Sequence, residues 1–152
     1  MADVYHQHPD WPAFLAAIRA EPGADLPRLA AADFLDDHDE PERARLIRLQ
    51  CERERLRPTL PFKDTDAKSH WEVVSHQAAV AEYNGGTPWP TVRALKEQTR
   101  SSQSAAFGFT RGFLESVTCP ADVWVKHGDA LLAREPVTAV TLTDSPELVR
   151  EP

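Results

Sequence analysis

The residues best suited to chemistry in this chain form an acidic cluster between positions 33 and 40. Its members are Asp33, Asp36, Asp37, His38, Asp39 and Glu40. Hard divalent cations prefer such oxygen ligands, so a metal-dependent hydrolase subunit that uses this acidic turn is one functional alternative. The spacing fails the calcium-loop pattern, because the required glycine and the final glutamate are both missing. A solvated acidic turn is the simpler interpretation, and we expect neither a metal nor a cofactor there.

Histidines supply two further groups of possible metal ligands. His6 and His8 lie close to Asp10 near the start of the chain, and His70 and His76 are six residues apart. Six residues place two side chains on different faces of a helix, so we expect these histidines to be incidental. The chain also lacks the nucleophile elbow, the phosphate loop, the dinucleotide glycine fingerprint and the zinc-protease helix. We therefore predict a protein that is not an enzyme.

Six arginines between residues 43 and 57 form an Arg stripe. They are Arg43, Arg45, Arg48, Arg53, Arg55 and Arg57, with Glu42, Glu52 and Glu54 interleaved at helical pairing distances. A nucleic-acid-associated accessory protein that uses Arg45, Arg48 and Arg55 is a second alternative. However, 17 basic and 24 acidic residues give a net charge of −7, which opposes non-specific attraction to phosphates. A salt-bridged surface, or a surface that docks a protein, fits the stripe better.

Two helices must hold these groups. Asp25 is a good N-cap and Pro27 suits a first turn, so a helix should begin at about Leu26. Its apolar face is expected to hold Leu26, Leu29, Ala30 and Phe34, with Asp33 among them. Asp39 or Glu40 then caps a helix with Pro41 in its first turn, on which Leu46, Leu49 and Leu56 share one side, flanked by Ile47 and Cys51. A shorter helix with Pro12 in its first turn precedes both.

Asp33 is the acidic residue that the helical pattern places on an apolar face. A buried carboxylate needs a cationic partner, which Arg28, Arg43 or Arg48 could supply. We expect such a pair, together with Gln50, to fix the packing angle of the two helices. Loss of Asp33 would then cost a few kcal/mol, because a buried arginine would remain without its partner.

The segment FLAAIRAEPGADLPRLAAADFLDDHDEPERARLIRLQCE resembles the repeat-companion domain, a short helical family of planctomycete proteins that often precedes leucine-rich repeats. The resemblance covers roughly a quarter of the chain. It is carried by Pro27, Arg28, Leu29, Asp33, Leu35, Pro41, Arg43, Ala44, Ile47, Arg48 and Gln50. The family is expected to have Tyr and Trp where this chain has Ala31 and Phe34, which puts aromatic contacts at these positions in doubt. The resemblance implies an architecture and a setting, and no reaction.

The rest of the chain divides into two parts. Residues 58–103 are expected to form a helical extension with a Pro-rich crossing loop, a helix from about Asp66 to Tyr83 and a weaker helix between Val92 and Thr99. Residues 104–152 should contain one strand with a bulge or two short strands, then a helix, then the strand PVTAVTLTD. On that last strand Val140 and Leu142 share one face. Such a strand–helix–strand element is near the ~20–29-residue period of leucine-rich repeats and resembles a solenoid cap.

Length and composition are those of an ordinary globular protein. A chain of 152 residues with 41% hydrophobic and 27% charged residues can bury a core, and residues 1–57, 58–103 and 104–152 are expected to pack as one unit. Cys51 and Cys119 are the only cysteines. No signal peptide or long apolar run is evident, so we expect a cytoplasmic protein with reduced thiols and no membrane contact.

These observations together predict a mainly helical α+β protein. Its N-terminal head should have three to four helices, followed by the small strand–helix–strand element. We expect a non-enzymatic adaptor, a stand-alone member of the repeat-companion group, that docks a protein partner, with no small-molecule substrate and no nucleic acid. The candidate partner-binding residues are Arg45, Arg48, Arg55, Val140 and Leu142. Docking could use the Arg stripe or the exposed edge of the last strand.

Overall fold

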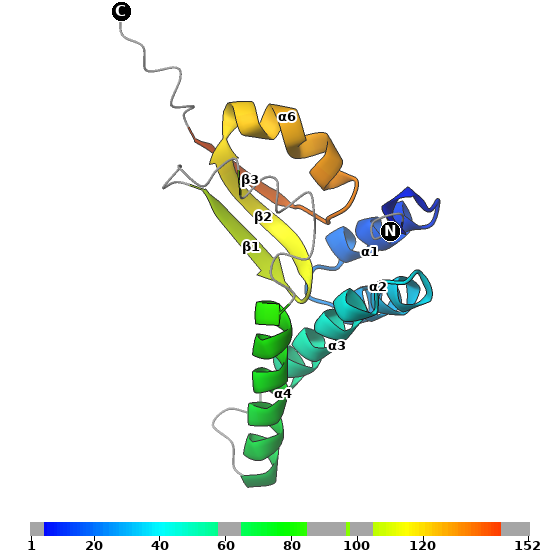
Figure 1. The fold of residues 1–152 in the computed structure, drawn as a ribbon, viewed down its shortest axis with the longest axis vertical. Coiled ribbons are helices and arrows are strands. Elements are labelled where there is room, and N and C mark those ends of the chain that lie inside the picture. The colour runs from blue at the N-terminus through cyan, green and yellow to red at the C-terminus, as the bar shows by residue number, and fades with distance from the viewer. Residues whose placement is uncertain (1–4, 58–64, 85–96, 98–104, 144–152) are drawn as a thin grey trace, which may run out of the picture. The chain divides into compact units, whose positions relative to one another are not determined.

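A computed structural model describes residues 5–57, 65–84, 97 and 105–143, and it divides into two compact units, residues 1–86 and 87–152. Helices dominate and the strands form one small sheet, so the predicted α+β, mainly α class is confirmed (Figure 1). The sequence suggested a boundary after residue 57, whereas the structure groups the fourth helix with the helices before it. Packing of the two units as one body stays a prediction, and the expected helix at 92–99 lies outside the described residues.

The first unit is a helical head. A short 3-10 helix, η1 (Tyr5–Gln7), precedes α1 (Trp11–Ala20), α2 (Leu26–Asp37), α3 (Pro41–Leu56) and α4 (Thr65–Asn84). Each of α1, α2 and α3 has a proline in its first turn, where no backbone N–H is needed. Asp25 and Glu40 occupy the N-cap positions of α2 and α3, but neither side chain makes the expected capping hydrogen bond. Figure 1 shows α4 running beside α3.

The turn between α2 and α3 is a Schellman motif. Asp39 has a φ of 62°, in the left-handed region, and the backbone N–H of Glu40 donates to the Leu35 carbonyl at 2.9 Å. His38 donates from its own backbone N–H to the same carbonyl at 3.1 Å. The motif satisfies a carbonyl that the end of α2 leaves free, and it turns the chain directly into α3.

The buried face of α2 is not the one predicted. Arg28, Ala31, Ala32 and Leu35 are buried, whereas Leu26 is 78% exposed and Asp33 points to solvent. Arg28 can lie in this face because its guanidinium donates to the Pro22 carbonyl at 2.7 Å. The apolar face therefore runs through Ala31 and Ala32, and Asp33 lies on its flank.

The buried face of α3 is also shifted from the predicted one. Leu46 is buried, but Leu49 and Leu56 are only half-buried. The buried side chains of this helix are Arg43, Ala44, Leu46, Ile47, Gln50 and Cys51. Buried residues of the other helices complete the core of the head: Tyr5, Trp11, Leu15, Ile18, Ala31, Ala32, Leu35, Val74 and Ala78.

Aromatic rings hold the buried Arg43. Its guanidinium donates to the Tyr5 hydroxyl and lies 5.5 Å and 5.7 Å from the ring centroids of Tyr5 and Trp11. Phe34 packs against Trp11 and Phe14, with centroid distances of 5.8 Å and 5.1 Å. Phe34 therefore provides an aromatic contact where the family resemblance left one in doubt, whereas Ala31 is small and fully buried.

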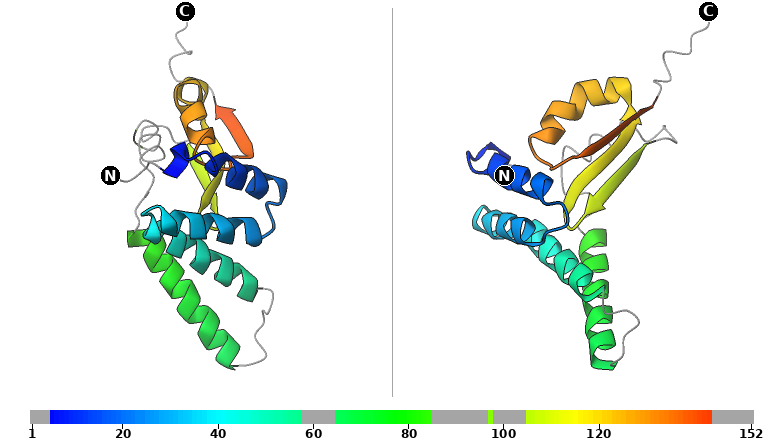
Figure 2. Two further views of the ribbon diagram at one scale, coloured as in Figure 1. Left: turned by 90° about the vertical axis from the view of Figure 1, so that its right-hand side faces the viewer. Right: turned by 180° about the vertical axis from the view of Figure 1, so that it is seen from behind.

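The second unit is a strand–strand–helix–strand element. β1 (Ala106–Thr110) and β2 (Phe113–Pro120) form an antiparallel hairpin, α6 (Ala121–Leu132) follows, and β3 (Ala139–Thr143) pairs in parallel with β2. The two-strand alternative for residues 106–120 is the one observed, with a register shift at Gly108/Phe109. Arg111 and Gly112, with φ of 46° and 83°, form the two-residue turn, as expected for a type I′ hairpin. Figure 2 shows α6 alongside the sheet, with β2 between β1 and β3.

Candidate interaction surface

β3 is an edge strand of the sheet. The strand order is β1-β2-β3, so among residues 105–143 only β2 pairs with it. Ala139, Val140, Thr141 and Leu142 are all exposed. The outward backbone N–H and C=O groups of this strand therefore have no strand partner in the part of the chain that the structure describes. Such an edge can accept another strand.

Val140 and Leu142 extend the apolar face of the sheet to this edge. Val140 pairs with Val117 and Leu142 with Cys119, and paired residues of parallel strands point to the same face. Val117 and Cys119 are 1% and 0% exposed, whereas Val140 and Leu142 are 38% and 52% exposed. The two predicted partner-binding residues of β3 thus share a face with the core of the unit but are only partly covered. This confirms that they share a face; their role in binding stays a prediction.

α6 and the segment after it hold the sheet in place. The Trp124 ring lies over Gly128, where an added Cβ would meet a ring atom at 2.9 Å, so this helix position needs a glycine or a shift of the ring. Glu135 is buried, and its carboxylate accepts the backbone N–H of Leu114 at 3.0 Å. This hydrogen bond ties the chain that enters β3 to the start of β2. Burial raises the pKa of the Cys119 thiol, and the nearby Asp122 carboxylate adds to the rise.

Arg48 in the Arg stripe is held by two carboxylates of α2. Its two terminal nitrogens lie 2.8 Å from Asp33 and 2.8 Å from Asp36, which sit three residues apart on the same face of the helix. The hydrogen bond that Arg48 donates to Asp33, followed by the one it donates to Asp36, raises the pKa of Arg48. The expected Asp33–arginine pair is therefore present, but Asp33 is 75% exposed, so the predicted burial is wrong.

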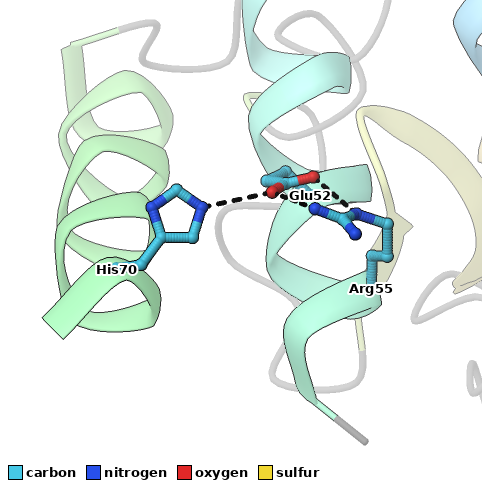
Figure 3. Close-up of polar contacts among 3 residues, drawn as sticks. All are labelled: Glu52, Arg55 and His70. Atoms are coloured by element: carbon cyan, nitrogen blue, oxygen red, sulfur yellow. Dashed lines mark hydrogen bonds and ion pairs between the residues drawn. The ribbon is translucent and has the colours of Figure 1, made fainter. Parts of the chain in front are cut away.

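A second arginine of the stripe is engaged on α3 itself. Arg55 donates from Nε and a terminal nitrogen to the two carboxylate oxygens of Glu52, at 2.8 and 2.6 Å. Figure 3 shows the His70 imidazole, on α4, pointing at the same carboxylate, with Nε2 at 3.3 Å from Oε1. The bond from Arg55 is the main reason that the pKa of Glu52 is lowered. The three side chains link α3 to α4.

The remaining arginines of the stripe differ in their exposure. Arg43 is buried, and Arg57 lies 3.3 Å from Glu54. Arg45 is exposed, and no described residue forms an ion pair with it. The three arginines singled out from the sequence as partner-binding thus do not form one free basic surface, because Arg48 and Arg55 are already engaged by carboxylates.

Two histidines meet at one end of the head, a contact that the sequence did not predict. The ring of His38 stacks on Phe34 with centroids 3.9 Å apart, and its Nδ1 donates to the Phe34 carbonyl at 2.7 Å, since a carbonyl can only accept. The His8 ring lies 5.0 Å from that of His38. His8 Nδ1 in turn accepts the backbone N–H of Asp10 at 3.3 Å. The pair is a half-buried aromatic contact.

The described residues contain no cluster of side chains that could serve as a metal site. No three side chains of His, Cys, Asp or Glu come together there in a way that could hold an ion. The acidic turn is spread out: Asp33 and Asp36 face Arg48, while Asp37 and Asp39 point to solvent. Cys51 and Cys119 are both buried free thiols. Within the same residues no helix combines the length and the apolar character needed to span a bilayer.

Comparisons with family models, with curated proteins and with solved structures found no match to this chain. Its own exposed surfaces are therefore the basis for a functional proposal. Among them, the outer edge of β3 combines open backbone groups with exposed apolar side chains.

Proposed function

We propose that this protein is a non-enzymatic interaction module and that the outer edge of β3 is its docking site. The observation that supports this most directly is the half-covered pair Val140 and Leu142 on a strand that has one neighbouring strand among residues 105–143. An added strand would bond to the open backbone groups, and its apolar side chains would cover the exposed pair. Main-chain hydrogen bonds would supply affinity, and side chains on one face would supply specificity.

The Arg stripe is the less favourable docking surface. A partner carboxylate or a phosphate would have to displace Asp33 and Asp36 from Arg48 before it could bind there. The same obstacle exists at Arg55, which already donates two hydrogen bonds to the Glu52 carboxylate. The net charge of −7 adds long-range repulsion for any polyanion. These contacts favour a protein partner at the strand over a nucleic acid at the helix.

We also propose that the chain is a member of the repeat-companion group and acts in the cytoplasm. The motif positions support the first proposal, because Arg28, Ala44, Ile47 and Gln50 all contribute to the core of the head. The buried free thiols of Cys51 and Cys119 support the second, since such thiols persist in a reducing compartment.

A photo-crosslinking amino acid tests the docking site directly. Placed at Leu142, it should form a covalent adduct with a protein in living cells. The same probe at Arg45, which is exposed on α3, is the matched control for the Arg stripe. An adduct at Arg45 with none at Leu142 would move the docking site to the stripe, and no adduct at either position would contradict the proposal.

A further inference from the structure

A second exposed apolar feature lies on α6. Val125 is 84% exposed and Leu132 is 38% exposed. Seven residues span nearly two helical turns, so both side chains lie on one flank of the helix, here called the apolar flank. Val125 directly follows Trp124, and Leu132 directly follows Leu131. Trp124 and Leu131 lie on the side of α6 that packs on the sheet. The apolar flank is therefore turned by about 100° from the side that packs on the sheet.

The handedness of the unit places this flank beside the open edge. The connection from β2 through α6 to β3 is right-handed: in the left view of Figure 2, with α6 in front, β3 lies to the right of β2. α6 runs opposite to the two strands, and a right-handed helix advances clockwise along its axis. A turn of about 100° from the sheet-facing side then points toward β3 and away from β1. Val125 and Leu132 thus flank the same edge as Val140 and Leu142.

We propose that this combined surface binds a second copy of the chain, with β3 pairing antiparallel to its counterpart about a two-fold axis at Thr141. The inference rests on the proposed function and names the partner. In this register Val140 faces Leu142 of the second copy and Leu142 faces its Val140, so the strand is complementary to itself. Ala139 and Thr143 pair in the same way on the opposite face. Two-fold pairing closes the assembly and leaves no further β3 edge open.

The helices fit the same symmetry. If α6 lies over β2 and β3, a strand spacing of about 4.8 Å puts the two copies of α6 about 10 Å apart across the axis. That is the distance at which helices pack, about 8–10 Å. The two apolar flanks then meet, and Val125 and Leu132 become covered together with the strand residues. A lone peptide strand would cover Val140 and Leu142 but would leave the apolar flank exposed.

Charge also favours a second copy at this edge. No charged residue occurs between Pro136 and Thr143, so the two β3 strands pair without like-charge contacts along this segment despite a net charge of −7 on each copy; on α6 the exposed Asp129 lies beside Val125 and Leu132. Edge strands that must stay single usually carry a lysine, a proline or a bulge. β3 has none of these between Ala139 and Thr143, and Pro136 lies before the strand begins.

Sedimentation velocity on the whole chain, from about 1 to 200 μM, tests the dimer. Leu142→Lys and Val125→Lys should each weaken dimerisation at least about tenfold, because each buries an ammonium group in the interface. Ala130→Lys, an exposed change on the other flank of α6, is the matched control and should leave the dimer intact. Circular dichroism confirms that each variant is folded.

A symmetric disulfide tests the register. Thr141→Cys should cross-link two chains under mild oxidation, because facing residues in an antiparallel pair are about 4.5–5.5 Å apart between Cα atoms. Ala139→Cys, on the same strand and face, should not, because its two copies would lie about 13 Å apart. Equal cross-linking of the two variants would refute the register. A wild-type monomer at every concentration would overturn the dimer. If the wild type is a monomer but the photo-crosslinker at Leu142 captures a different protein, the proposed docking function stands and only the dimer is refuted. If it captures nothing, the dimer and the docking function are both refuted.

Discussion

Replacing Asp39 by glycine should stabilise the helical head. Asp39 holds the left-handed position of the Schellman turn between α2 and α3, with a φ of 62°. A non-glycine residue in this region costs about 1–2 kcal/mol relative to its preferred conformations, and aspartate lies at the low end of that range. Glycine removes this strain but loses about 0.4–1 kcal/mol through the greater freedom of the unfolded chain. The net expectation for Asp39→Gly is a gain of about 0.5 kcal/mol.

The matched control is the same substitution two residues earlier. Asp37 is exposed and is the last residue of α2, so Asp37→Gly removes the same charge from a right-handed helical position. It should lose a few tenths of a kcal/mol through lower helix propensity. The two variants therefore have opposite signs although their chemistry is identical.

Urea denaturation followed by circular dichroism measures both variants. Near the denaturation midpoint of a unit of 60–100 residues, each kcal/mol also shifts the melting temperature by about 4–8 °C, so a rise of about 2–4 °C is expected for Asp39→Gly. If both variants are less stable than the wild type, the Asp39 side chain must stabilise the turn by more than the left-handed backbone conformation costs. That result would refute the assignment of strain to this position.

Three further predictions concern one ion pair at the surface and two buried side chains. Arg48→Met should cost at most about 1 kcal/mol of unfolding free energy, and the cost should shrink in 1 M salt, because the pair with Asp33 is exposed and screened; a salt-independent loss would contradict this. Tyr5→Phe should cost about 1.5–3 kcal/mol in urea denaturation, because it removes a hydrogen-bond acceptor from buried Arg43; an unchanged stability would argue against that bond. The thiol of Cys119 should react with thiol reagents only after unfolding. The free energy of unfolding should fall as the pH rises above about 8.5, because the pKa of this thiol is raised in the folded state and the thiol of the unfolded chain therefore ionises first. In Cys119→Ala this fall should be smaller.

Local signals in the sequence were sufficient for the positions of the helices in the described part of the chain. Pro27 and Pro41 mark the first turns of α2 and α3 correctly, because a proline at that place acts through its own fixed φ and missing N–H. The alternation of Val140 and Leu142 likewise gave the correct face of β3, since a period of two is a property of any strand.

The buried faces of the helices could not be read in the same way. Arg28 and Arg43 are buried although a periodicity argument counts them as polar. Arg43 depends on a hydroxyl 38 residues away in the chain, at Tyr5, and such partners are invisible in a local window. Once these arginines take core positions, Asp33 turns outward. The predicted ion pair still forms, because Asp33 and Asp36, three residues apart on α2, can both reach the Arg48 guanidinium from the exposed side of the helix.

The candidate surface was only half visible in the sequence. Val140 and Leu142 were singled out there, but Val125 and Leu132 were missed, although two apolar residues seven apart on a helix are a recognisable stripe. Whether such a stripe is covered depends on the handedness and the order of the strands, and these follow from the fold. The contact between His8 and His38 was missed for the same reason, because thirty residues separate its partners.

The parallel pairing of β3 sets an order of assembly for the second unit. β1 and β2 are joined by a two-residue turn, so this hairpin can zip together through neighbours along the chain. β3 meets β2 only after the intervening residues have wound into α6 and closed a much larger loop, at a higher entropic cost. The strand that completes the sheet is therefore also the one that can detach from it while the hairpin stays closed.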